Sequence, residues 1–268
     1  MKIIHISDLH YGRTGKLTNK LVQKIITIYA NNSEKPLVII TGDLVEDGSR
    51  KTMSACKEEL QRLVDNNFDL LVCPGNHDVK KMGGFLESQK LLKRFNLYFH
   101  SLFPKGRNIC GDEDNNQLEY PKTFRFGDYF FIGLNTNRTS KKSTPGGMLE
   151  TSQLHELDAL ITSIQKEHPN SKLVVFMHHH PFEYEFNINN VITFREMQLF
   201  DRNDFIKIIQ GRVNVLLFGH VHENLRLTEE EKKYNIGLIQ LSVQSEHDEN
   251  KIQFNEIDLD GLKVTARS

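Results

Sequence analysis

Short groups of Asp, Asn and His recur at five places along the chain, and each group directly follows an apolar run. Carboxylate, amide and imidazole side chains are ligands that proteins use to bind divalent metal ions. The five groups are Asp8-Leu9-His10, Gly42-Asp43, Gly75-Asn76-His77-Asp78, His178-His179-His180-Pro181 and Gly219-His220-Val221-His222. One such group is common in a solvated turn, whereas five in one chain predict a metal centre.

The spacing within the groups allows the centre to hold one ion or two. Residues i and i+2 of an extended segment point to the same face, so Asp8 and His10 can reach one ion or two adjacent ions. The same holds for His220 and His222. Asp43 has two carboxylate oxygens, which suits a bridge between ions about 3.5–4 Å apart. Asn76 would add a neutral oxygen ligand.

A glycine stands directly before the polar residues in three of the groups, at Gly42, Gly75 and Gly219. Glycine is favoured where the backbone turns sharply or approaches a neighbour so closely that a Cβ atom would clash. We expect such a close approach at all three positions. Pro74 before Gly75 adds to the expectation of a turn there.

The elements that must position these groups alternate between strand and helix in the first part of the chain. Apolar runs at 2–6, 36–40 and 70–73 predict buried strands, and helical patterns at 16–30 and 50–66 separate them. This alternation favours parallel strands joined by right-handed crossovers. The polar groups then lie at the carboxyl ends of the strands, where α/β sheets build their ligand sites.

The remainder of the chain continues the pattern and then departs from it. Helices are predicted over 85–103, 151–167 and 203–210, a hairpin over 123–134, and strands over 173–176, 213–218, 235–243, 251–258 and 262–266. The last three read as consecutive strands with turns at 248–250 and 260–261. Residues 182–203 lack a clean period, which predicts a cap insertion over the site. We expect two stacked sheets with helices outside, in a single domain over 1–268.

Composition is ordinary for a globular protein, with 38% hydrophobic and 26% charged residues in 268. The 34 basic and 35 acidic residues nearly cancel, so no global field attracts nucleic acid or a membrane surface. The sequence contains no signal-peptide pattern and no apolar run near the roughly 20 residues of a spanning helix. The widely spaced Cys56, Cys73 and Cys110 favour free thiols in a reducing compartment. These features predict a cytoplasmic protein.

Histidines outside the five groups are expected to have structural or surface positions. His5 lies inside the first predicted strand, so we expect it to be buried and hydrogen-bonded. Four others have no partner at metal-ligand spacing and are predicted at the surface, namely His100, His155, His168 and His247.

The order of the five groups resembles the calcineurin-like metallophosphoesterase superfamily. Its pattern is Asp-x-His, Gly-Asp, Gly-Asn-His-Asp/Glu, a lone His and Gly-His-x-His, and all five parts stand between residues 8 and 222. The resemblance implies an α/β fold, a four-layer α/β/β/α sandwich of two mixed β-sheets flanked by helices. It also implies two divalent metal ions at the sheet edges. Mixed His and Asp ligation favours Mn, Fe or Zn over Mg.

Carried over by position, the resemblance implies two ligand sets that share one carboxylate. The first ion is assigned Asp8, His10, Asp43 and His222, and the second is assigned Asp43, Asn76, His179 and His220. The family's histidine lies two positions before a proline, which selects His179, with His178 as the runner-up. His178 and His180, together with Asp78, are then candidates to support the ligands or to face substrate.

His77 matches the family's histidine that faces the phosphate without binding metal. It can stabilise the transition state and protonate the leaving alkoxide. The implied reaction is in-line attack on phosphorus by a metal-bound hydroxide. In several branches an acidic residue three positions after the Gly-Asp aspartate orients this histidine. That position is Glu46 here, and whether Glu46 reaches His77 stays open.

Finer features of the motifs favour one branch of the superfamily. Ser/Thr protein phosphatases carry Gly-Asp-x-x-Asp-Arg-Gly and Gly-Asn-His-Glu, whereas this chain has Glu46-Asp47-Gly48 and Asp78. The histidine triplet before Pro181, and the run Gly147-Met148-Leu149 with Gln153-Leu154, resemble the bacterial class III cyclic-nucleotide phosphodiesterases. We therefore expect a phosphodiesterase for a small phosphodiester, with a cyclic nucleotide as first choice.

Other functions of the superfamily remain as alternatives. A metal-dependent nuclease or a phosphomonoesterase would use the same centre, although the near-neutral charge does not favour nucleic acid as a partner. A non-catalytic protein-binding scaffold is the alternative of a different class. Since every ligand position is filled in this chain, catalysis is the preferred interpretation.

Overall fold

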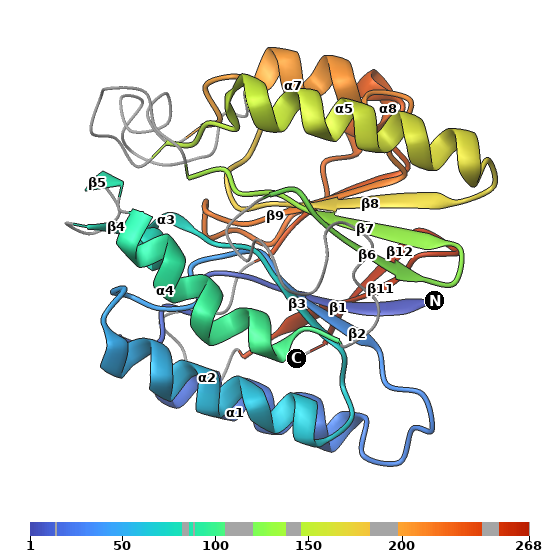
Figure 1. Ribbon diagram of the computed structural model, residues 1–268. Coiled ribbons are helices and arrows are strands. Elements are labelled where there is room, and N and C mark those ends of the chain that lie inside the picture. Colours follow the sequence, from blue (N-terminus) through green and yellow to red (C-terminus); the bar gives the residue numbers. More distant parts are fainter. Residues whose placement is uncertain are drawn as a thin grey trace.

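Two five-stranded sheets lie face to face in the computed structural model, and helices cover the outer face of each sheet (Figure 1). The structure describes residues 1–13, 15–81, 86–87, 89–104, 120–137, 146–182, 198–242 and 252–267. This four-layer arrangement confirms the predicted fold class. Most of the predicted insertion at 182–203 lies outside the described residues.

The first sheet has the strand order β12-β11-β1-β2-β3 and is mixed. Its strands are β1 (Lys2–Ile6), β2 (Leu37–Ile40), β3 (Leu70–Val72), β11 (Phe254–Asp258) and β12 (Lys263–Arg267). β1, β2 and β3 run parallel, whereas β11 is antiparallel to both β1 and β12. The outer face is covered by α1 (Gly15–Ile28), α2 (Arg50–Asp65) and α4 (Gln89–Phe99) (Figure 1).

The second sheet has the order β10-β9-β8-β7-β6. Its strands are β6 (Lys122–Phe126), β7 (Tyr129–Gly133), β8 (Lys172–Phe176), β9 (Val215–Phe218) and β10 (Leu238–Leu241). β6 and β7 form the predicted hairpin, and β7 to β10 run parallel. Its outer helices are α5 (Glu150–Glu167), α7 (Arg202–Ile209) and α8 (Thr228–Tyr234). Smaller elements are α3 (Asn76–Val79), β4 (Lys80–Lys81), β5 (Leu86–Glu87) and the 3-10 turn η1 (His100–Leu102).

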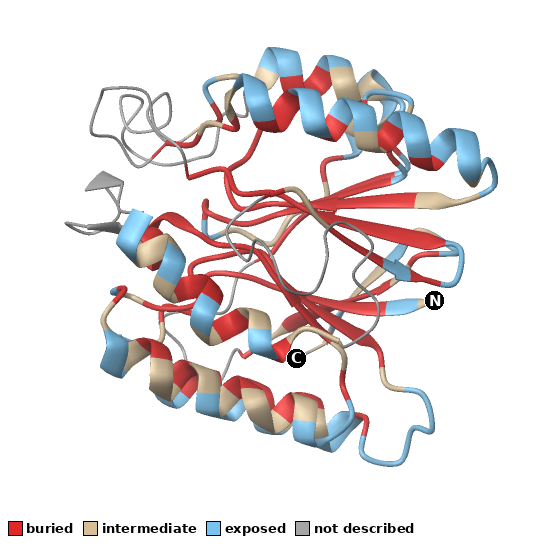
Figure 2. Ribbon diagram, viewed as in Figure 1, coloured by how far each residue is buried: buried red, intermediate tan, exposed pale blue. Residues whose placement is uncertain are grey.

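Apolar side chains fill three interfaces, which is why the central strands are buried on both faces (Figure 2). Ile39 and Phe131 meet between the two sheets. Ile4 packs under the helices of the first sheet, and Val175 under those of the second. Strands buried on both faces are continuously apolar, so a run such as Leu37–Ile40 shows no alternation.

Strands are confirmed in all three predicted segments at the end of the chain, and the turn at 260–261 joins β11 to β12, but the three strands do not lie in one sheet. β10 lies parallel to β9 in the second sheet, whereas β11 and β12 pair in the first. A parallel neighbour needs a crossover, which α8 supplies between β9 and β10. α8 was not predicted because the segment Thr228–Tyr234 has no buried residue and therefore no apolar period. The expected turn at 248–250 lies outside the described residues.

Several isolated expectations can be checked against the fold. His5 is buried in β1 and its Nε2 lies 3.0 Å from Thr41 Oγ1, as expected. His100 is not the surface residue that was predicted, because its ring stacks on Phe103 with centroids 4.7 Å apart. Cys56 and Cys73 are buried free thiols. Among the described residues, helices that could cross a membrane are absent.

Candidate metal centre

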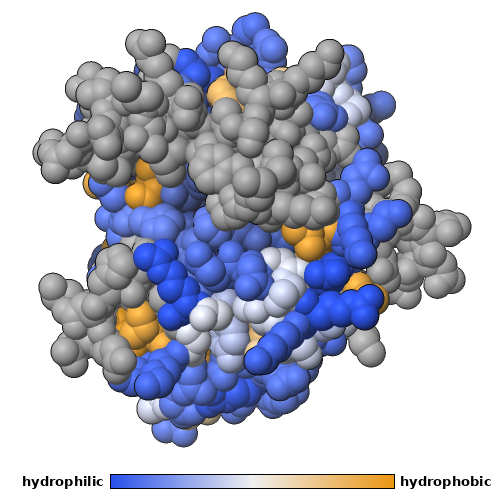
Figure 3. Space-filling model, turned by 90° about the vertical axis from the view of Figure 1, so that its left-hand side faces the viewer, coloured by the Kyte–Doolittle hydropathy of each residue, from blue (hydrophilic) through white to orange (hydrophobic). Residues whose placement is uncertain are grey.

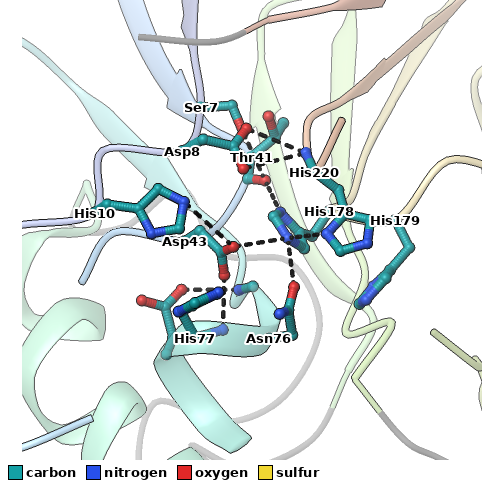
Figure 4. A network of polar contacts seen from close by, with 12 residues as sticks. Ser7, Asp8, His10, Thr41, Asp43, Asn76, His77, His178, His179 and His220 are labelled. Carbon is teal, nitrogen blue, oxygen red and sulfur yellow. Dashed lines mark hydrogen bonds and ion pairs between the residues drawn. The ribbon is translucent and has the colours of Figure 1, made fainter. Parts of the chain in front are cut away.

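The five polar groups meet at one end of the two sheets, although they are far apart in sequence (Figure 4). Each follows the carboxyl end of a parallel strand, and they come from β1, β2, β3, β8 and β9 in turn. The parallel strands β1 to β3 and β7 to β10 end on the same side of the molecule, so their following loops face one another (Figure 1). Hydrophilic residues occupy most of the described surface on this side, including its centre (Figure 3).

Five of the predicted ligand residues adopt a left-handed backbone conformation that is uncommon outside glycine. They are Asp8 (φ 55°), His10 (φ 42°), Asp43 (φ 50°), His220 (φ 75°) and His222 (φ 55°). Such conformations cost free energy and persist where the surrounding contacts impose them. Asp8 N donates to Gly42 O at 3.0 Å and His10 N to Asp43 O at 2.9 Å. Their concentration at one place makes this edge the candidate functional site.

The three glycines lie where the backbone segments come closest, as expected. A Cβ atom on Gly75 would be 2.2 Å from Asp43 N, and one on Gly219 would be 1.8 Å from Ser7 Oγ. One on Gly42 would be 2.8 Å from the backbone of Gly75. Only glycine permits these approaches, which draw the ligand-bearing loops together.

The first ligand group consists of Asp8, His10 and His222. The Nε2 atoms of His10 and His222 are 3.4 Å apart, and Asp8 Oδ1 is 3.6 Å from His222 Nε2. The ligand atoms of all three residues lie within 4.8 Å of one another. Both carboxylate oxygens of Asp8 also accept from the backbone N–H of His220, at 3.1 and 3.2 Å, which ties this group to the next.

The second ligand group surrounds His178 Nε2. This nitrogen lies 3.3 Å from Asp43 Oδ2, 3.0 Å from Asn76 Oδ1 and 3.1 Å from His220 Nδ1. The other ring nitrogen, Nδ1, donates to Thr41 O at 2.8 Å. That bond holds the His178 ring so that Nε2 points at the other three residues.

Asp43 lies between the two groups. Its Oδ2 is 3.8 Å from His10 Nε2 in the first group and 3.3 Å from His178 Nε2 in the second. Its Oδ1 accepts the backbone N–H of His77 at 2.8 Å. Oδ2 of Asp43 thus faces both groups, while Oδ1 is hydrogen-bonded to the backbone of His77.

The electrostatics of the second group fit a cation. Burial opposes the charged form of His178, but the Asp43 carboxylate outweighs it and raises the pKa of His178 to about 9. Burial also opposes ionisation of Asp43, yet His178 holds its pKa well below the usual range. The centre therefore attracts positive charge. A proton on His178 Nε2 can form a hydrogen bond to only one or two of the neighbouring oxygen and nitrogen atoms. A metal ion binds carboxylate oxygen, amide oxygen and imidazole nitrogen at the same time.

Within the histidine triplet, the runner-up His178 lies closest to the other proposed ligands. His178, the runner-up, reaches Asp43 and Asn76, whereas His179 Nδ1 lies 2.7 Å from Thr136 Oγ1. His180 Nδ1 donates to Phe182 O at 2.9 Å, and burial lowers the pKa of His180 to about 4. Among the described residues, the candidate ligand groups include neither His179 nor His180.

Glu46 lies nearer to His77 with its main-chain oxygen than with its carboxylate, which is at ion-pair distance. His77 Nδ1 lies 3.1 Å from the main-chain oxygen of Glu46 and 4.0 Å from its carboxylate. The Glu46 carboxylate instead lies 2.9 Å from His10 Nδ1. The His77 side chain is 20% exposed, so it borders the open side of the centre.

Three further residues contact the backbone or the histidines of the centre, namely Asp78, Thr41 and Thr136. Asp78 accepts from the backbone N–H of Gly75 at 2.8 Å and of Val45 at 3.0 Å, which joins the loops after β3 and β2. Burial and the neighbouring Asp43 raise the pKa of Asp78 to about 7. Thr41 and Thr136 were not predicted. Thr136 stands in the polar run 135–137 after β7, a signal of the same kind as the five groups.

Comparison with known proteins shows which family the chain belongs to. A family model described as calcineurin-like phosphoesterase matches residues 1–224. The chain is 34% identical over 107 residues to the DNA double-strand break repair protein Mre11 of Sulfolobus acidocaldarius, covering 36% of this chain and 28% of that protein. It is 27% identical over 188 residues to the probable glycerophosphodiester phosphodiesterase GpdQ of Arcobacter nitrofigilis, covering 68% and 58% respectively.

The solved structures are similar in fold. Purple acid phosphatase PPD1 from yellow lupin aligns with 99% of this chain and 52% of its own, with a TM-score of 0.61 and 12% identity. The aligned chain thus spans less than two thirds of each of these relatives.

Proposed function

The chain belongs to the calcineurin-like phosphoesterase family. We propose that it is a metallophosphoesterase that hydrolyses a small phosphodiester at a centre of two divalent metal ions. The observation that carries this proposal is the position of Asp43 Oδ2, 3.8 Å from His10 Nε2 and 3.3 Å from His178 Nε2. One carboxylate oxygen facing two ligand groups suits two ions that share it.

The proposed ligand sets follow the two groups. Asp8, His10, Asp43 and His222 hold one ion, and Asp43, Asn76, His178 and His220 hold the other. When bound, the two ions lower the pKa of a water molecule, orient the phosphate and neutralise developing charge. Mn, Fe and Zn suit these mixed ligands better than Mg.

His77 supplies the proton in this proposal. Its Nδ1–H donates to Glu46 O at 3.1 Å, which leaves Nε2 to face the phosphate. In its protonated form, Nε2–H can stabilise the transition state and then pass its proton to the leaving alkoxide. His77 is left out of both proposed ligand sets because it is assigned the role of acid, although one ligand atom each of His10, Glu46 and His77 also lie within 4.8 Å of one another.

A cyclic nucleotide is the proposed substrate, on the motifs around Gly147 and Pro181. The similarity to a probable glycerophosphodiester phosphodiesterase over 68% of this chain supports the wider class of small phosphodiesters. A nuclease is the second candidate, favoured by the similarity to a DNA repair protein over 36% of this chain. The net charge of −1 gives DNA no general attraction.

A hydrolysis panel with Mn²⁺ tests the substrate class. It contains cyclic AMP, cyclic GMP, 2′,3′-cyclic nucleotides, a glycerophosphodiester, a phosphomonoester and single-stranded DNA. The proposal predicts fastest turnover of a small diester, with a cyclic nucleotide first. Hydrolysis of DNA and of no other compound in the panel would favour the nuclease function over the proposed one. Protein with two bound ions could fail to hydrolyse every compound of this panel and also bis(p-nitrophenyl) phosphate. That result would support the alternative of a non-catalytic scaffold.

A further inference from the structure

Glu46 contacts two histidines of the centre through different parts of the residue. We propose that its carboxylate positions the metal ligand His10, while His77 is oriented by the main-chain oxygen of Glu46 and not by its side chain. The inference rests on the proposed ligand role of His10. It departs from the expectation that an acidic side chain at this position orients the family's phosphate-facing histidine.

The backbone fixes Glu46 beside His10. The segment after β1 and the segment after β2 run side by side, with His10 N donating to Asp43 O at 2.9 Å and Tyr11 N to Leu44 O at 3.0 Å. Glu46 N then donates to Tyr11 O at 3.0 Å, and Tyr11 and Val45 form an isolated parallel bridge. The register of these bonds places the Glu46 side chain next to the His10 ring.

The side-chain geometry selects the form of His10 that can bind metal. Glu46 Oε2 lies 2.9 Å from His10 Nδ1, so the carboxylate holds the proton on Nδ1. Nε2 then carries the lone pair and faces His222 Nε2 at 3.4 Å and Asp43 Oδ2 at 3.8 Å. A carboxylate behind a ligand histidine fixes the ring and raises its basicity toward the metal.

The contact with His77 has a different origin. Its Nδ1 is 3.1 Å from Glu46 O but 4.0 Å from the carboxylate, which is beyond hydrogen-bond range. Any residue at position 46 supplies the same main-chain oxygen. Substitution of the Glu46 side chain should therefore disturb the His10 side of the centre and leave the His77 contact in place.

Three variants separate these roles. Glu46→Ala removes the carboxylate, Glu46→Gln keeps an oxygen without its charge, and Glu58→Gln makes the same change at an exposed position on α2. Binding of Mn²⁺ to metal-free protein is measured by calorimetry and by EPR, neither of which requires turnover. Circular dichroism checks that each variant folds, which the 35% exposure of the Glu46 side chain leads us to expect.

The expected result is the loss of affinity for one ion only. Glu46→Ala should bind one Mn²⁺ like the unmodified protein and the other about 10–100-fold more weakly, with Glu46→Gln between them. The EPR spectrum of coupled manganese should then give way to that of isolated Mn²⁺. At saturating Mn²⁺, the ratio of rates for diesters with alkyl and p-nitrophenyl leaving groups should stay unchanged.

Two results would overturn the inference. The first is unchanged affinity for both ions in Glu46→Ala. The second is intact metal binding with a selective loss of rate for poor leaving groups, because that pattern would place the Glu46 side chain on His77. If the phosphodiesterase proposal itself fails, the diesters remain intact in the unmodified protein, while the two binding affinities still decide the role of Glu46.

Discussion

Asp43 is the residue on which both ligand groups depend, since its Oδ2 faces His10 in one group and His178 in the other. The ligand types could be predicted from the sequence, because Asp, Asn and His after apolar runs are distinctive. Which histidine of residues 178–180 lies nearest to Asp43 and Asn76 could not be predicted from the sequence. It depends on the main-chain oxygen of Thr41, which accepts from His178 Nδ1, and a main-chain acceptor leaves no mark in the sequence.

Substitution of the two neighbouring histidines tests whether His178 or His179 is the ligand. His178→Ala should lose one ion, because Nε2 of His178 is the atom that faces Asp43 and Asn76. His179→Ala is the matched control and should retain both ions, since His179 contacts Thr136 instead. Metal content after gel filtration is the measurement. Two ions in His178→Ala with one in His179→Ala would identify His179 as the ligand.

His77→Ala tests the proposed acid. For a diester with an alkyl leaving group we expect kcat to fall by about 10²–10⁴-fold. The fall should be smaller for bis(p-nitrophenyl) phosphate, because p-nitrophenolate leaves without a proton. Both ions should remain bound, and His155→Ala on the exposed face of α5 serves as the control. An equal loss of rate for both substrates would speak against a role as acid.

At the scale of elements, the centre exists because the strands of two sheets end at the same edge. The alternation of strand and helix predicted the first sheet, whose apolar runs are continuous. The pairing of β10 escaped prediction because α8, the crossover that delivers it, has no buried residue. The left-handed backbone at residues such as Asp8 and His220 was also beyond prediction, since it comes from contacts between loops distant in sequence.

Gly75→Ala tests the close approach of these loops. Its Cβ would stand 2.2 Å from both Asp43 N and Asp43 Oδ1, so the shared carboxylate must move. We expect loss of both ions, measured as metal content, with the fold retained by circular dichroism. Gly15→Ala is the control, because its Cβ would make an ordinary contact of 3.5 Å with Tyr11. Retention of both ions by Gly75→Ala would show that the approach is not required.

At the scale of the whole molecule, the buried His5 and the partly buried His100 contribute to how stability depends on pH. Burial lowers the pKa of His5 to about 3, and burial with nearby Lys122 lowers that of His100 to about 3, from an ordinary 6.5. The unfolded chain takes up protons below about pH 6.5 while the folded chain does not. The contribution of these two histidines to stability is therefore full above that pH and is lost as the pH drops toward 3.

Denaturant unfolding of metal-free protein at several pH values measures this slope. His100→Phe removes one of the two groups, so its free energy of unfolding should fall less between pH 7 and pH 5 than that of the unmodified protein. His155→Gln, which replaces an exposed histidine, should leave the slope unchanged. A slope in His100→Phe equal to that of the unmodified protein would contradict the assignment.

Titration of metal-free protein with Mn²⁺, followed by hydrolysis of bis(p-nitrophenyl) phosphate at each step, tests the central claim most directly. If Asp43 joins two ligand groups into one phosphodiesterase centre, two ions bind per chain and full activity requires both. A chelator should then abolish the activity. Full activity with one ion bound, or hydrolysis by the metal-free protein, would contradict the account.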